Sequence, residues 1–97
     1  MSEQKWTPAP WQAATDMPGA WVIWRGVPAE AVLAELYSDD MGYEHNAEAN
    51  AHLMAAAPDM AAAIQLFIDS LEGRDVHPEE AIGALRASLA KARGEQP

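Results

Sequence analysis

The sequence predicts an α+β domain in which a small antiparallel sheet of two to three strands, in the N-terminal half, packs against two to three C-terminal helices. Two observations predict this class. The first 37 residues contain short runs suited to strands, separated by proline and glycine. From about residue 47 onward the apolar residues recur every three or four positions, which is the spacing of a helix. A chain of 97 residues buries one core, so we expect a single domain, 1–97.

Short runs with turn residues between them predict the strands. We expect strands at about 11–15 and 20–25, joined into a hairpin by Asp16-Met17-Pro18-Gly19, which has the residues of a tight turn. Residues 31–37 alternate in a way that suits a third strand, but their alanine, leucine and glutamate also favour a helix. We favour the strand, and the helix remains open.

Three helices are expected at about 46–56, 58–72 and 78–93. Pro58 separates the first two, because proline suits a first helical turn and disfavours helical geometry in the residue before it; a sharp kink is the alternative. Gly73 should end the second helix. The spacing of the large apolar residues predicts a buried stripe along these helices, formed by Leu53, Met54, Met60, Ile64, Phe67, Ile68 and Leu71, followed in the third helix by Ile82, Leu85 and Leu89.

The net charge of −9 is concentrated in the middle of the chain. Residues 1–25 and 74–97 each sum to zero, whereas the segment from Gly26 to Gly73 holds nine carboxylates and no lysine or arginine. Such a segment attracts basic surfaces and repels nucleic acid and anionic lipid. The predicted partner-binding residues are the six acids between positions 30 and 48: Glu30, Glu35, Asp39, Asp40, Glu44 and Glu48. The alternative is that these acids only keep an alanine-rich protein in solution.

The composition excludes several classes of function. Without cysteine the chain forms no disulfide, thiolate zinc site or cysteine nucleophile. Its serines lack a hydrolase motif, and its glycines are too scattered to cradle a phosphate. No apolar run approaches the roughly 18 residues that span a bilayer, and the start lacks the plan of a secretion signal. We therefore expect a cytoplasmic, non-enzymatic protein that needs no cofactor and binds neither membrane nor nucleic acid directly.

One constellation could hold a metal ion. His45, Glu48 and His52 are spaced three and four apart, so they share a face if the helix begins by His45. A surface contact between Glu48 and His52 is the simpler interpretation, and we expect no metal.

All four tryptophans fall in the first 24 residues. Aromatic platforms that stack on nucleic-acid bases normally come with basic residues, which are scarce here. We therefore expect Trp6, Trp11, Trp21 and Trp24 to fill the seam between sheet and helices.

Two motifs resemble a known group of proteins. The start reads Thr7-Pro8-Ala9-Pro10-Trp11, and residues 48–60 read Glu-Ala-Asn-Ala-His-Leu-Met-Ala-Ala-Ala-Pro-Asp-Met. The pair is similar to short uncharacterised bacteriophage and prophage proteins with a Thr-Pro-x-Pro-Trp start and an Ala-Asn-Ala-x-Leu-x-Ala-Ala-Ala-Pro-Asp/Glu helix. His52 stands where the group more often has arginine. The resemblance implies a phage origin and no particular activity.

A phage origin gives the acidic segment a specific interpretation. Carboxylates can substitute for the phosphates that a host machine grips, so we expect an acidic inhibitor of a host nucleic-acid-binding defence complex, of the anti-CRISPR type. Its partner would be a host protein with a basic surface. The alternative is a structural or regulatory phage accessory that self-assembles through its alanine faces, for instance as a homodimer. A metal-dependent enzyme built on His45, Glu48 and His52 is the third hypothesis.

Overall fold

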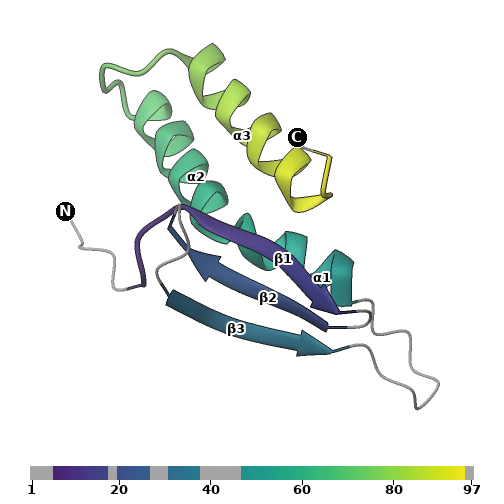
Figure 1. The fold of residues 1–97 in the computed structure, drawn as a ribbon. Helices are drawn as coiled ribbons and strands as arrows, with labels where there is room; N and C mark the ends of the chain where they lie inside the picture. Colours follow the sequence, from purple (N-terminus) through teal and green to yellow (C-terminus); the bar gives the residue numbers. More distant parts are fainter. Residues whose placement is uncertain (1–5, 18–19, 27–30, 38–46, 96–97) are drawn as a thin grey trace.

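The fold is a three-stranded sheet with helices on one side, which confirms the predicted α+β class (Figure 1). The computed structural model describes residues 6–17, 20–26, 31–37 and 47–95. The chain runs through β1 (Trp11–Met17), β2 (Ala20–Arg25), β3 (Ala31–Tyr37), α1 (Ala47–Ala55), α2 (Ala57–Leu71) and α3 (Pro78–Ala92). Residues 31–37 are thus a strand, and the helical alternative is wrong.

The sheet is an antiparallel meander in the order β1-β2-β3. In its centre Ala13, Ile23 and Ala34 lie side by side on adjacent strands. β1 continues two residues beyond the predicted 11–15, so the prediction that Asp16 and Met17 belong to the turn is wrong. The pairing of β1 with β2 shifts register in this region, and this irregularity accommodates the extra residues. Pro18 and Gly19 lie outside the described residues.

Residues 7–11, the first of the two motifs, fold back onto the sheet. The indole Nε1 of Trp11 donates to the carbonyl oxygen of Thr7 at 2.9 Å. Arg25, at the end of β2, donates through Nε to the carbonyl oxygen of Pro8 at 3.3 Å. These bonds attach the N-terminal segment to the strand end, so the motif has a structural role.

The core lies between the sheet and α1. Ile23 is the largest fully buried side chain among the described residues, and it clusters with Ala51 and Ala55 of α1. Alanine lets the helix backbone come close to the sheet but buries little area. The fully buried part of this core is therefore one isoleucine with alanines, and larger, partly buried side chains of the sheet surround it.

Only two of the four tryptophans occupy the predicted seam. Trp11 and Trp21 pack against the Ile23 cluster. Trp6 is 48% exposed. Trp24 follows Ile23 in β2 and therefore points to the opposite face of the sheet, because successive side chains of a strand alternate. The prediction that all four fill the seam is thus wrong for Trp6 and Trp24.

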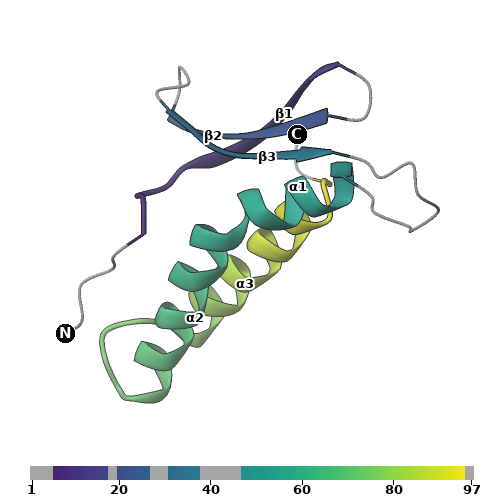
Figure 2. The same ribbon diagram turned by 90° about the horizontal axis from the view of Figure 1, so that it is seen from below.

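The chain bends by 43° between α1 and α2, where Ala56 and Pro58 are both buried. The predicted separation into two helices is thus confirmed, with the break at Ala56, two residues before Pro58. Beyond the bend, α2 and α3 form an antiparallel hairpin that extends away from the sheet (Figure 2). The Cα radius of gyration is accordingly 15.4 Å, against about 13 Å for a compact domain of about 100 residues. No single described helix is long and apolar enough to span a membrane; α1 and α2 meet the criterion only as a bent pair.

The prediction of a buried apolar stripe is wrong for most of its members. Ile64 is 53% exposed and Leu71 is 71% exposed, and the other large exposed members are Leu53, Met54, Phe67, Ile68, Ile82 and Leu89. The bend carries α2 past the edge of the small sheet, which leaves α3 as its principal neighbour. At that contact the buried residues are small: Ala63 of α2, with Ala81 and Ser88 of α3.

Both hairpin helices end at a glycine with positive φ, 78° at Gly73 and 75° at Gly94. The amide of Glu95 bonds the carbonyl of Ala90 at 2.9 Å, and the amide after Gly73 bonds the carbonyl of Asp69 at 3.0 Å. In both cases the hydrogen bond spans six residues, and the glycine just before its donor takes the left-handed conformation. This is the Schellman motif that commonly ends a helix. The predicted role of Gly73 as the end of the second helix is confirmed.

The two glycines differ in their surroundings, which allows a matched comparison. A Cβ at Gly94 would lie 2.8 Å from Cδ2 of His52, a ring that packs against Trp21, whereas a Cβ at Gly73 meets nothing within 4 Å. We expect Gly73→Ala to lower the free energy of unfolding by about 1 kcal/mol through backbone strain alone. Gly94→Ala should lower it by about 2 to 4 kcal/mol, since the clash adds to that strain. Urea denaturation measures both, and equal losses would refute the contact with His52.

Candidate interaction site

Among the described residues, all the helices lie on one side of the sheet, and its other face carries none. Ile23 points to α1, so Val22 and Trp24, on either side of it in β2, point away. The strand register places further residues beside these two. We call the resulting set the outer sheet face; it comprises Gln12, Ala14, Val22, Trp24, Val32 and Glu35. Figure 2 shows all three helices on the other side of the sheet.

The outer sheet face combines an apolar centre with an acidic group. Trp24 is partly buried, and its cross-strand neighbour Val32 is 48% exposed. Glu35 is exposed and lies opposite Val22 on the adjacent strand. A large aromatic beside aliphatic side chains can pack against a partner's apolar group, while the carboxylate accepts hydrogen bonds from a cation. This face therefore suits a surface that is both basic and partly apolar.

The structure places two of the six predicted partner-binding acids. Glu35 belongs to the outer sheet face. Glu48 is exposed in the first turn of α1, the helix that covers the other face, so the structure does not bring these two together. The other four lie outside the described residues: Glu30, Asp39, Asp40 and Glu44. Their contribution to a common surface stays a prediction.

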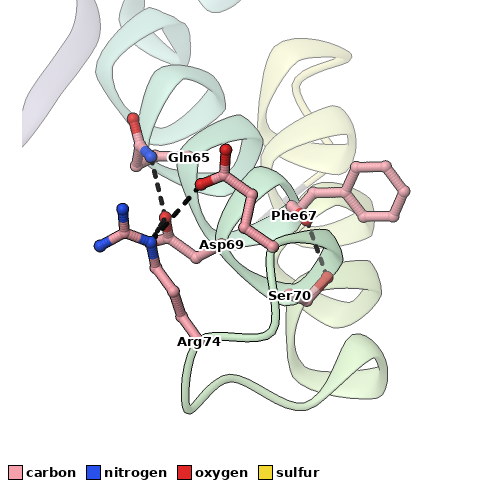
Figure 3. A network of polar contacts seen from close by, with 6 residues as sticks. Gln65, Phe67, Asp69, Ser70 and Arg74 are labelled. Carbon is pink, nitrogen blue, oxygen red and sulfur yellow. Dashed lines mark hydrogen bonds and ion pairs between the residues drawn. The ribbon is translucent and has the colours of Figure 1, made fainter.

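Part of the acidic segment is paired with cations from the last quarter of the chain. Nζ of Lys91 lies 2.6 Å from Oδ2 of Asp59 and joins the end of α3 to the start of α2. Nε of Arg74 lies 3.5 Å from Oδ1 of Asp69 and 3.5 Å from Oε1 of Glu72 (Figure 3). The acids that the acidic segment contributes to the hairpin are thus paired with cations.

His52 has a packing role in the structure. Its ring centroid lies 5.3 Å from that of Trp21, and its edge lies against Gly94. Its Nε2 is 3.9 Å from Oε2 of Glu48, as expected for a pair at the helix surface. His45 lies outside the described residues, and within the described ranges no three histidine or acidic side chains gather closely enough to hold a metal.

A groove of about 350 Å³ runs between α2 and α3. Half of its lining residues are alanines, and its polar groups already have partners: Ser88 Oγ donates to the carbonyl of Leu85 at 2.9 Å, and Lys91 binds Asp59. None of the buried side-chain polar atoms in the described residues lacks a partner. The groove therefore presents little chemistry for a ligand.

Sequence reasoning missed the apolar half of the outer sheet face. The signal was present in β2, where Trp21, Val22, Ile23 and Trp24 are apolar at successive positions. A strand with apolar groups on both faces leaves one set uncovered when helices pack on one side only. What the sequence did not reveal was that all the helices lie on the Trp21 side.

The chain matches one family model over almost its whole length. The model is described as Salmonella phage P22 protein Y8K6, and it matches residues 1–96. No curated protein and no solved structure matches the chain.

The Asp59–Lys91 pair permits a test of its contribution to the hairpin. Both side chains are partly shielded, so we expect a coupling free energy of about 1 kcal/mol between Asp59→Asn and Lys91→Met in a double-mutant cycle. Raising the salt concentration should reduce it. Arg74, whose side chain is 65% exposed, is the control and should couple less with Asp69. A coupling for Lys91 no larger than that for Arg74 would contradict this.

Proposed function

The chain belongs to the family of Salmonella phage P22 protein Y8K6, and on this premise we propose that it is a phage accessory protein that acts by binding a host protein, without catalysis. The proposed partner has a basic surface, and the contact includes the outer sheet face. The site of action is the cytoplasm of the host cell.

One observation carries this proposal. Glu35 lies opposite Val22 on the same sheet face as the partly buried Trp24 and the 48% exposed Val32, in a segment with nine carboxylates and no lysine or arginine. Aromatic anchors supply much of the binding energy at interfaces, and charge complementarity sets the partner and the rate of encounter. An apolar patch with an acidic border therefore favours a basic protein surface over nucleic acid or an anionic membrane.

The more specific form of the proposal concerns host defence. A complex that grips nucleic acid does so with lysine and arginine, which neutralise phosphates. Carboxylates on a small protein can occupy the same groups and compete with the nucleic acid. We propose that the protein is an acidic inhibitor of such a complex, of the anti-CRISPR type.

The test is to measure binding to a purified nucleic-acid-guided defence effector, with and without competing DNA. We expect Glu35→Lys to weaken binding at least about tenfold, because reversal removes an attraction and adds a repulsion. Asp75→Lys is the matched control, since it makes the same change in net charge in the exposed loop between α2 and α3. It should alter binding by less than about twofold.

Three outcomes would contradict the proposal. Lack of binding at low salt, where steering is strongest, would end it for the effectors tested. Equal weakening by Glu35→Lys and Asp75→Lys would show a diffuse effect of net charge. Binding that DNA does not displace would exclude competition with nucleic acid.

The exposed apolar residues of the α2–α3 hairpin favour the second hypothesis, a self-assembling structural or regulatory accessory protein. Charge reversal separates the two. If Glu35→Lys leaves both partner capture and phage function intact, the acids only keep the protein in solution, and the self-assembling accessory is the better description.

A further inference from the structure

The hairpin exposes large apolar side chains that a monomer does not cover. In α2 these are Ile64, Phe67, Ile68 and Leu71, and in α3 they are Ile82 and Leu89, with exposed fractions between 37% and 71%. Such residues occur singly on most protein surfaces, but a contiguous apolar patch marks an interaction site. Whether they form a patch depends on how the two helices are rotated toward each other.

In α2 the exposed row lies beside the row that contacts α3. Asp59, Ala63 and Leu66 line the groove shared with α3. At about 100° per residue, the exposed row lies on the other side of Ala63: Phe67, Leu71, Ile64 and Ile68 are rotated from it by about 40°, 80°, 100° and 140°. Figure 3 shows the Phe67 ring pointing away from the polar group formed by Gln65, Asp69 and Arg74.

In α3 the exposed row is displaced in the same sense. Ala84, Ser88 and Lys91 line the groove, and Ile82, Leu85 and Leu89 lie roughly a third of a turn further round. Because the two helices are antiparallel, equal rotations about their own axes bring both rows to the same side of the hairpin. We call this combined surface the hairpin face: Ile64, Phe67, Ile68, Leu71, Ile82, Leu85 and Leu89.

The area of the hairpin face is sufficient for a dimer. With on the order of 200 Å² for a large side chain, burial of the six exposed members removes about 600 Å² per copy, or about 1,200 Å² in total. Stable, specific interfaces begin at about that size. The positions of the face are all apolar, and Asp59 and Lys91 pair with each other in the groove, on the other side of the contact between α2 and α3. A second copy can therefore approach despite the net charge of −9 on each chain.

We propose that two copies of the chain associate through their hairpin faces into a four-helix bundle with two-fold symmetry. The bundle supplies the burial that the hairpin lacks, since the fully buried residues of α2 are Pro58 and Ala63 and those of α3 are Ala81 and Ser88. A second copy fits better than a lipid surface for two reasons. The exposed rows of α2 and α3 form ridges that can pack into the grooves of another helix pair, and an anionic lipid surface would repel an acidic chain. The inference does not depend on the proposed binding of a host protein, and it gives the self-assembling alternative a specific interface.

The test is sedimentation equilibrium of the full chain over a range of concentrations, with Ile64→Glu as the disrupting variant. Ile64 is 53% exposed in the single chain, so glutamate there is compatible with the folded monomer but places a carboxylate within the proposed interface. We expect the dimer Kd to rise ~100-fold or more. Gln65→Glu, one residue along and on the polar side of α2, adds the same charge and should leave the dimer Kd within about threefold.

The far-UV circular dichroism spectrum of Ile64→Glu must match that of the unchanged protein, which shows that the variant is folded. Ile68→Lys is a second disrupting variant and introduces the opposite charge. The melting temperature of the unchanged protein should rise with its concentration, and that of both variants should not. A monomer up to millimolar concentration, or a dimer that survives both substitutions, would overturn the proposal. So would a monomer that binds phosphatidylcholine vesicles through Ile64. Glu35→Lys should dimerise normally, so failure of this inference is distinguishable from failure of the proposed function.

Discussion

The rest of the structure depends on the packing of Ile23 against Ala51 and Ala55. A small sheet gains stability when a helix covers its apolar face, and α1 supplies that helix. Its alanines bring the backbone near the strands, and partly buried side chains of the sheet pack around this contact, the larger ones being Trp11, Trp21, Leu33 and Leu36. This core takes up few of the large apolar side chains of α2 and α3, so these side chains stay available for other contacts.

Much of the fold could be predicted from the sequence, because local chemistry determines it. Pro58 and Pro78 occupy first helical turns, and Gly73 and Gly94 have the positive φ that helix ends require. Residues 31–37 were ambiguous between strand and helix, and pairing with β2 decided in favour of the strand. Local patterns thus predicted where the elements begin and end, with an error of two residues at the end of β1.

The burial of the helices and the candidate site were harder to predict, because they depend on how elements pack. A period of three to four identifies the apolar side of α2, but it does not say whether a sheet, another helix or solvent lies against it. The 43° bend decides this for Ile64 and Leu71. Likewise, the run of apolar residues in β2 did not show that Trp24 faces away from the helices. Of the acidic residues in the predicted site, Glu35 lies on the outer sheet face, whereas Glu48 belongs to α1, the helix that covers the opposite face.

The bend between α1 and α2 also separates the molecule into two ends with different chemistry. One end holds the open sheet with Trp24 and Glu35, and the other holds the apolar side of the hairpin. Chains joined at their hairpins would hold two sheets at fixed positions, pointing away from the junction. A target with repeated subunits could then engage both sheets at once, and the second contact would form at a high effective concentration. Weak recognition by each sheet would add up to slow release from such a target.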